Sequence, residues 1–184
     1  KIHNLAKKLW GINRSITGDG VRKTLSILNE HVKDLVIVEV ASGTQAFDWV
    51  LPKEWSILSG YILTPSGQKI CDFNENNLHI LGYSKPVDDS ISLEELNRHL
   101  YSLPNQPDAI PYVTSYYAER WGFCLSHNQR ELLEEGTYKV KIDSCLFDGN
   151  LTYGELIIKG DSDKEVFIST YVCHPSMANN ELSG

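Results

Sequence analysis

Leu35-Val36-Ile37-Val38-Glu39-Val40 is a run of mostly β-branched residues that predicts a strand. Only one of its residues is polar, so we expect it to be buried on both faces, in a parallel or mixed sheet under helices. Ahead of it, apolar residues recur at helical spacing in residues 2–9, ending near Gly11, and in residues 21–32. Two helices before a buried strand predict the α/β class, with a mixed sheet flanked by helices.

The last part of the chain carries two more apolar stretches of strand length, Gly154–Gly160 and Glu165–Cys173. The second leads into His174, and functional groups collect beyond the carboxyl ends of strands in open α/β sheets. Histidine is the commonest metal ligand, and zinc also accepts oxygen ligands of the kind that follow at Asn180 and Glu181. This pattern indicates a metal site at the strand end. A structural histidine that closes the strand with a hydrogen bond is the alternative.

The middle of the chain, residues 49–151, has short, aromatic and turn-rich segments. Ser92 and Ser126 each precede Glu or Gln by three residues, which is the capping-box spacing that opens a helix. Residues 137–142 alternate like a half-buried strand, residues 61–70 predict two strands around a turn, and residues 78–83 predict another strand. We interpret this stretch as a small, β-rich α+β domain inserted into the larger fold.

Composition and charge exclude several classes of protein. The 184 residues hold 17 Lys plus Arg against 24 Asp plus Glu, a net charge of −7, which disfavours a nucleic-acid binder because such proteins need a basic face. No apolar stretch is long enough to cross a membrane, and the first residues do not resemble a signal peptide. Four widely spaced cysteines are typical of reduced thiols in a cytoplasmic protein, and two disulfides are the alternative.

Three further groups of residues are candidates for binding or catalysis. Tyr116, Tyr117 and Trp121 could form an aromatic platform for a sugar ring or a peptide, or simply a core cluster. Arg14 and the residues before the second helix could bind an anion, or a side chain there could cap the helix. His127 follows Cys124 by three residues, but the hydrogen bond that a Cys–His nucleophile needs cannot be judged from spacing.

Five stretches of the sequence, taken together and in order, resemble a known family across essentially the whole chain. They are Arg14-Ser-Ile-Thr-Gly-Asp-Gly20, Phe47-Asp-Trp49 with Pro52-Lys-Glu-Trp55, Ile110-Pro-Tyr-Val-Thr-Ser-Tyr-Tyr117, Arg120-Trp-Gly-Phe-Cys124, and Cys173-His-Pro-Ser-Met-Ala-Asn-Asn-Glu-Leu-Ser-Gly184. The chain resembles bacterial proteins with an aminopeptidase-like domain that are encoded among polysaccharide-biosynthesis genes. That family is in turn similar to the co-catalytic zinc aminopeptidases, whose fold is a mixed sheet flanked by helices.

The resemblance implies a zinc site that begins at His174. In the wider group an Asp follows this histidine after two residues, where the present chain has Ser176. The bridging Asp of the group corresponds to Asn180, and an amide brings no charge to a site between two cations. Three readings stay open: Glu181 takes over as ligand, the site holds a single metal, or the site is degenerate.

The resemblance also predicts a division of the chain and a function. Residues 1–48 and 152–184 would belong to the aminopeptidase-like core, with the insertion between them, and the remaining ligands and the general base would lie further along a longer protein. We expect that full-length protein to hydrolyse an amide at a free amine terminus of a small peptide or an amino-sugar-like substrate, using zinc. The 184-residue chain itself should bind zinc weakly and be inactive. The alternative is a non-catalytic module that binds a saccharide or amino-sugar intermediate.

Overall fold

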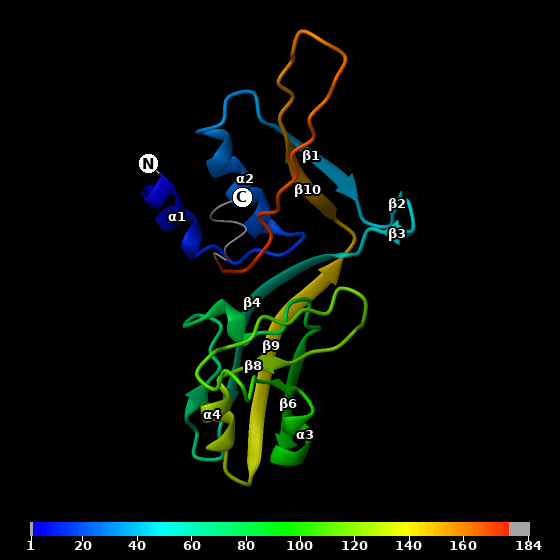
Figure 1. The fold of residues 1–184 in the computed structure, drawn as a ribbon. Helices are drawn as coiled ribbons and strands as arrows, with labels where there is room; N and C mark the ends of the chain where they lie inside the picture. Colours follow the sequence, from blue (N-terminus) through cyan, green and yellow to red (C-terminus); the bar gives the residue numbers. More distant parts are fainter. Residues whose placement is uncertain (1, 177–184) are drawn as a thin grey trace. The chain divides into compact units, whose positions relative to one another are not determined.

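The first part of the fold combines two helices with a two-stranded sheet (Figure 1). The computed structural model describes residues 2–176. Helix α1 spans Ile2–Trp10 and α2 spans Asp19–Asn29, while strand β1 (Val36–Ala41) pairs with β10 (Asn150–Glu155) in antiparallel register. A small hairpin joins β2 (Gln45–Ala46) to β3 (Trp49–Val50). The chain forms two units, residues 1–54 with 147–184 and residues 55–146, whereas the sequence predicted boundaries at 48/49 and 151/152.

Both predicted N-terminal helices are present, and each buries part of its apolar face. Leu9 of α1 is buried, and Val21 and Leu25 of α2 are only 3% and 4% exposed. The predicted apolar face extended to Val32, but α2 ends before that residue. Helix α2 has Gly18 at its N-cap, and this residue makes no side-chain cap hydrogen bond.

Strand β1 is not buried on both faces, which corrects the prediction for residues 35–40. Val36 is 58% and Ile37 is 40% exposed. Within the described part of the chain β1 pairs only with β10, and this pairing is antiparallel. Burial on both faces requires helices packed on each side of a larger sheet. The two-stranded sheet is not covered in this way, so the apolar side chains of β1 are partly exposed to solvent.

The strands predicted at 154–160 and 165–173 are also wrong, apart from the two residues that end β10. Residues 156–171 form a long loop, which we call the apolar arm, coloured orange in Figure 1. Val166, Phe167 and Ile168 on this arm are 86–90% exposed. Their composition favours a strand, but a strand needs a neighbour that pairs with its backbone N–H and C=O groups, and none of the described residues supplies one.

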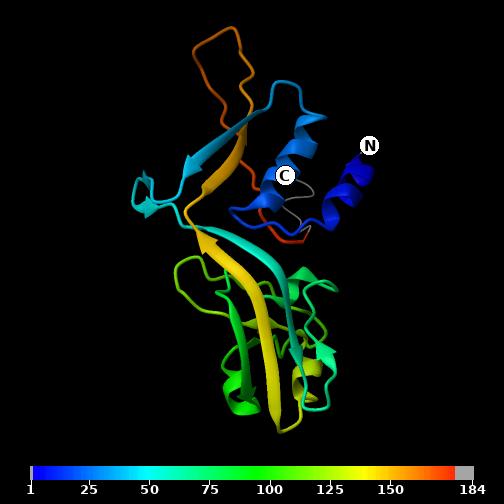
Figure 2. The same cartoon turned by 180° about the vertical axis from the view of Figure 1, so that it is seen from behind.

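The second unit is built on a four-stranded sheet in the order β5-β4-β9-β6 (Figure 2). Its strands are β4 (Glu54–Leu63), β5 (Lys69–Ile70), β6 (Val87–Ser92) and β9 (Thr137–Phe147). The predicted strand pair around the turn at residues 64–67 is confirmed by the antiparallel pairing of β4 with β5. Residues 137–142 alternate between exposed and buried positions as predicted, and the alternation continues further along β9.

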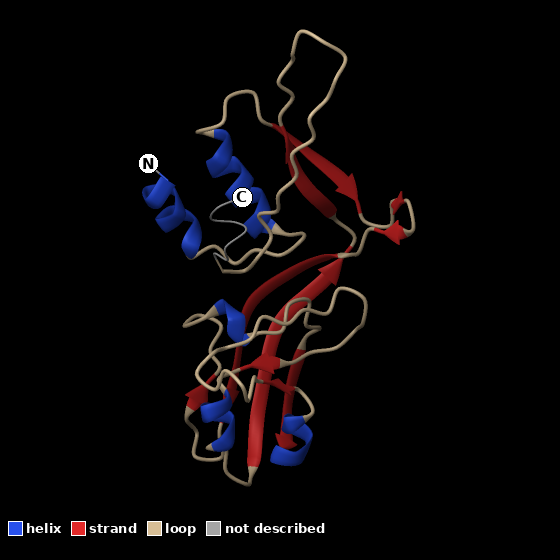
Figure 3. Cartoon of the chain, in the orientation of Figure 1, coloured by secondary structure: helices blue, strands red, loops and turns tan. Residues whose placement is uncertain are grey.

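Short elements complete this unit (Figure 3). Helices α3 (Leu93–Asn97) and α4 (His127–Glu131) begin where the sequence predicted, because Ser92 accepts a hydrogen bond from the backbone N–H of Glu95 and Ser126 accepts one from that of Gln129. Strands β7 (Leu100–Tyr101) and β8 (Phe123–Cys124) pair in parallel. The strand predicted at 78–83 is wrong: the 3-10 helix η1 (Asn77–His79) begins there, capped by the side chain of Asn76.

The hydrophobic core of the second unit lies between the sheet and these short elements. Its buried members come from β4, β5, β9, α3 and the strands β7 and β8, together with residues of the connecting loops; they are Ile62, Ile70, Cys71, Ile80, Leu93, Leu96, Leu100, Phe123, Leu125, Tyr138, Val140 and Ile142. Each buried methylene in such a core contributes about 0.8 kcal/mol. The positions of the short elements are therefore fixed by packing as well as by their caps.

Candidate functional site

His174 lies in a loop segment after the apolar arm and not at the end of a strand. Its Nδ1 is 2.6 Å from the carbonyl oxygen of Ser176 and 3.1 Å from the backbone nitrogen of the same residue. A carbonyl oxygen only accepts, so the shorter contact favours the tautomer in which Nδ1–H donates to it. Nε2 is then the nitrogen that carries the lone pair, which is how metal-binding histidines are usually oriented.

Arg14 is a fully buried cation that holds the backbone of His174. Arg14 is only 2% exposed, and its Nε donates a hydrogen bond to the carbonyl oxygen of His174 at 3.0 Å. A second guanidinium nitrogen donates at 2.6 Å to the carbonyl oxygen of Leu9, at the end of α1. A buried charge is costly unless its hydrogen bonds are satisfied. Arg14 therefore fixes the His174 segment to the N-terminal helix of the same unit.

The other two predicted ligands, Asn180 and Glu181, lie outside the described residues. Between residues 2 and 176 no group of three or more His, Cys, Asp and Glu side chains could hold a metal ion. A structural zinc takes four ligands, and a catalytic zinc takes three from the protein. The described residues thus supply one oriented imidazole and do not by themselves make a zinc site.

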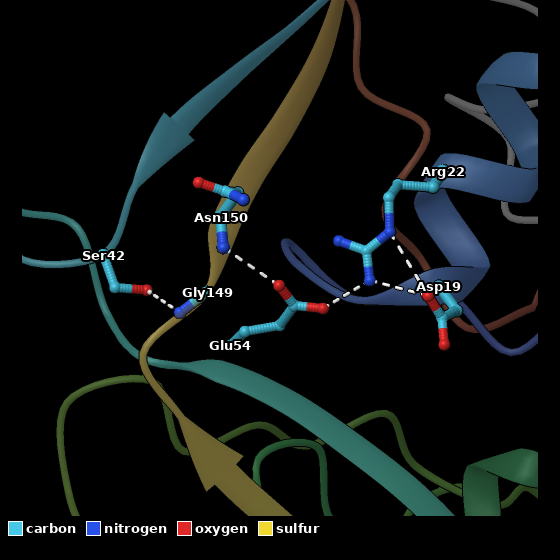
Figure 4. Close-up of polar contacts among 6 residues, drawn as sticks. All are labelled: Asp19, Arg22, Ser42, Glu54, Gly149 and Asn150. Carbon is cyan, nitrogen blue, oxygen red and sulfur yellow. Dashed lines mark hydrogen bonds and ion pairs between the residues drawn. The ribbon is translucent and has the colours of Figure 1, made fainter.

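A polar network around Glu54 was not predicted from the sequence (Figure 4). Glu54 is 3% exposed, and its carboxylate accepts a hydrogen bond from Arg22 of α2 and one from the backbone nitrogen of Asn150 at 2.9 Å. Arg22 also pairs with Asp19 at 2.7 Å. The hydrogen bond with Glu54 is the main cause that raises the pKa of Arg22 above its ordinary value.

This network fastens α2 to the start of β10. Gly149 donates its backbone N–H to the hydroxyl of Ser42 at 3.2 Å, next to the carboxylate of Glu54. The signal that could have revealed the network is a glutamate placed between Lys53 and the buried Trp55, at the entrance of an apolar strand. Sequence alone did not give its partner, because Arg22 is 32 residues away.

Two of the three predicted aromatic binding residues lie together. Tyr116 and Tyr117 are in edge-to-face contact at 6.4 Å, and Tyr117 is 83% exposed. Trp121 does not join them: it stacks on His99 with ring centroids 3.6 Å apart and meets the core ring of Phe123. Trp121 thus packs apart from the two tyrosines, against residues of the core.

Tyr116 and Tyr117 form the outer end of a row of rings that we call the aromatic ladder. Trp55 stacks on Tyr83 at 5.7 Å, and Tyr83 meets Tyr116 edge-to-face at 5.0 Å. Trp55 and Tyr83 are 5% and 3% exposed, so the ladder runs from the core to the surface. Tyr112, which is 41% exposed, shares a hydrogen bond between phenol oxygens with Tyr116 at 2.9 Å.

The cysteines do not point to thiol chemistry. Cys71, Cys124 and Cys145 are free thiols, and burial raises the pKa of both Cys71 and Cys124 to about 12. A thiol with so high a pKa is almost entirely protonated near neutral pH and is a poor nucleophile. His127, considered as a partner of Cys124, instead contacts Ser102 and Glu131.

Comparison with known proteins identifies the chain as a member of the family described as "Domain of unknown function (DUF2172)", which matches residues 54–145. The chain is also 50% identical, over all 184 of its residues, to a protein of Clostridium acetobutylicum named "Putative polysaccharide biosynthesis protein with aminopeptidase-like domain". This confirms the family resemblance. The chain spans 42% of the length of that relative.

A solved structure gives the same result for the fold. A crystal structure described as that of a "putative peptidase" from Clostridium acetobutylicum superposes with a TM-score of 0.92 at 50% identity, covering 99% of this chain and 43% of that one. The mixed α/β architecture is thus shared with a protein described as a peptidase. No helix in residues 2–176 is long and apolar enough to cross a membrane.

Proposed function

We propose that the chain is the N-terminal portion of a zinc-dependent, aminopeptidase-like hydrolase that acts on an amide at a free amine terminus. The names of its relatives support a peptidase-like protein in polysaccharide biosynthesis. The observation that carries the proposal is the held and oriented His174, with its carbonyl bound by buried Arg14 and its Nδ1 against the carbonyl of Ser176. We assign residues 1–48 and 152–184 to a zinc-aminopeptidase-like core with an inserted β-rich domain.

Bound zinc would polarise the scissile carbonyl and activate water in the full-length protein. The part that we assign to residues of this chain is to present the imidazole and to keep it in one orientation. Asn180 and Glu181 complete the proposed ligand set from this chain, and the general base comes from the part of the protein beyond it. One imidazole with one or two oxygen ligands does not make a complete zinc site, so the 184-residue chain alone should bind zinc weakly and be inactive.

Metal analysis of the full-length protein tests this proposal. We expect about one or two equivalents of zinc in the wild type and a loss of most of it in His174→Ala. His31→Ala, which removes an exposed histidine of the same unit, is the matched control and should keep its zinc. Release of an amino-acyl p-nitroanilide product should follow the zinc content. A full-length protein that holds no zinc, or a His174→Ala variant that holds as much as the wild type, contradicts the proposal.

The aromatic ladder supports a second candidate, a binding module for a saccharide or amino-sugar intermediate. Tyr117 and Tyr112 are exposed beside Tyr116, and tyrosine rings combine an apolar face with a polar tip. Saturation-transfer NMR with glucosamine and N-acetylglucosamine is the test. We expect a signal that Tyr117→Ala abolishes and that Trp121→Ala leaves in place, because Trp121 packs on His99. No signal with either sugar, or equal loss in both variants, contradicts this candidate.

We also place the protein in the cytoplasm as part of this proposal. The buried free thiols of Cys71 and Cys124 support a reducing compartment. Fractionation of cells that produce the full-length protein tests it, and recovery outside the cytoplasm contradicts it.

A further inference from the structure

His127 occupies the first position of α4, where each of its ring nitrogens faces one polar group. Nδ1 lies 3.1 Å from the hydroxyl oxygen of Ser102. Nε2 lies 3.6 Å from a carboxylate oxygen of Glu131, four residues later on the same helix. The imidazole is thus the middle member of a chain of three side chains, all within the second unit.

The two contacts agree on one protonation pattern for the ring. An ionised carboxylate only accepts, so Glu131 favours the proton on Nε2. The unprotonated Nδ1 then accepts a hydrogen bond from the hydroxyl of Ser102. A nucleophile, a base within hydrogen-bond reach and a third group that orients the base are the arrangement that activates serine. The Glu131 oxygen lies beyond hydrogen-bond distance from Nε2, so it acts on the ring through its charge.

Arg130 adds a fixed positive charge beside the hydroxyl of Ser102. Its guanidinium lies 3.5 Å from that oxygen. Three other contacts hold it in place: it donates to the carbonyl and side-chain oxygens of Asn97 at 3.0 and 3.2 Å and to the carbonyl oxygen of Leu100 at 3.0 Å. A cation already held in place can stabilise negative charge that develops during attack, without having to reorganise.

The helix α4 and the strand β7 position the side chains of Ser102, His127, Arg130 and Glu131. His127, Arg130 and Glu131 are at positions i, i+3 and i+4 of α4 and so lie on the same helix face. Ser102 directly follows β7, which pairs with β8. The side chain of His127 is 26% exposed and that of Glu131 is 69% exposed, so solvent reaches both side chains.

We propose that Ser102, His127 and Glu131 form a second reaction centre that transfers the acyl group of a small ester. The hydroxyl oxygen of Ser102 adds to the ester carbonyl carbon while its proton passes to Nδ1 of His127. The carbon–oxygen bond to the alcohol then breaks, and the alcohol leaves with that proton. Water, deprotonated by His127, attacks the acyl-serine and releases the carboxylic acid, and the proton returns to Ser102.

Covalent labelling of the intact protein with an alkyl fluorophosphonate, followed by peptide mass spectrometry, tests this centre. The reagent phosphonylates an activated serine with loss of fluoride. We expect labelling at Ser102 and a rate at least about 100-fold lower in His127→Gln, the size expected for loss of a general base. Glu131→Gln should also lower the rate. Ser90→Ala, which alters an exposed serine of the same unit, should label at Ser102 like the wild type.

The outcomes separate this centre from the proposed zinc site. Labelling that continues in the presence of a metal chelator supports a centre that does not need zinc. Absence of labelling at Ser102 overturns the proposal, and so does labelling at the same rate in His127→Gln. Circular dichroism of His127→Gln shows whether a lower rate reflects loss of the base or loss of the fold, since only a folded variant counts in support.

Discussion

Glu54 shows how one buried carboxylate can organise its surroundings. It accepts hydrogen bonds from Arg22 and from the backbone of Asn150, and Gly149 packs directly against its side chain. Breaking a buried, hydrogen-bonded ion pair costs more than forming it gains, because the remaining partner is left without compensation. Arg22 is partly exposed, but Glu54 is buried. We therefore expect substitutions in this network to lower the free energy of unfolding by more than the loss of a surface ion pair would.

Gly149→Ala tests the network without changing a charge. A Cβ at this position would overlap a carboxylate oxygen of Glu54 and lie 2.7 Å from its Cβ, so the carboxylate must move. We expect the free energy of unfolding in urea to fall by about 1–3 kcal/mol. Gly160→Ala, where nothing lies within 4 Å of the new Cβ, is the control and should change it by about 0.5 kcal/mol or less. Equal effects of the two variants would refute this account.

The contacts of Asp72 imply that the stability of the protein depends on pH in a particular way. The backbone N–H of Asn74 donates to its carboxylate at 3.0 Å and Lys69 pairs with it at 3.3 Å, and these contacts hold its pKa below the ordinary value. The stabilisation is then fully present above the unfolded pKa of about 3.9 and is lost as pH falls through the lower folded value. Asp72→Asn should therefore destabilise the protein at pH 7.

The difference between wild type and Asp72→Asn should shrink as the pH is lowered below about 4. Thermal unfolding at a series of pH values measures it. Asp163→Asn, which changes an exposed carboxylate in the apolar arm, should leave the profile unchanged. A constant difference between wild type and Asp72→Asn over the whole range would show that the contacts of Asp72 do not carry the effect.

At the scale of elements, β9 organises the second unit. Tyr138, Val140 and Ile142 point into the core and are at most 1% exposed, while the residues between them face outward. Ile142→Ala should reduce the free energy of unfolding by about 2–5 kcal/mol through lost burial and a residual cavity. Lys139→Ala, on the outer face, should cost about 0.5 kcal/mol or less. Chemical denaturation measures both variants, and an equal fall in the free energy of unfolding for Ile142→Ala and Lys139→Ala would mean that β9 does not pack as described.

Elements with a local cause were predictable from the sequence. The starts of α3 and α4 follow from Ser92 and Ser126, whose hydroxyls bind a backbone N–H three residues ahead. The turn at 64–67 and the alternation in residues 137–142 are local patterns as well. The strand predicted at 165–173 failed because pairing depends on a partner elsewhere, and a propensity for β structure cannot supply one.

The same distinction applies to the candidate sites. His174 could be singled out from its neighbours in the sequence, but its anchor, Arg14, is 160 residues away. The contact of His127 with Ser102 spans 25 residues, and only the fold brings the two together. The stacking of Trp121 on His99 could not be predicted from the sequence, because an aromatic residue in the sequence looks the same whether it packs on a histidine or faces a ligand.

At the scale of the whole molecule, the second unit has the core that an independent domain needs. All twelve buried residues of the hydrophobic core cluster lie within residues 55–146. We expect residues 54–146 expressed alone to unfold cooperatively, because domains with their own core fold as units. Heat denaturation followed by circular dichroism measures this, and Leu96→Ala should lower the midpoint. A broad, non-cooperative transition would show that the unit depends on the rest of the chain.

We expect the apolar arm to determine how this chain behaves in concentrated solution. Val166, Phe167 and Ile168 are almost fully exposed and have high strand propensity, and their backbones pair with no described strand. Such a segment is a template for pairing between copies. The 184-residue polypeptide prepared alone should self-associate as its concentration rises, visible as growing light scattering, and Phe167→Lys should keep it dispersed. Storage conditions for this polypeptide would then depend on three hydrophobic side chains that lie six to eight residues before His174.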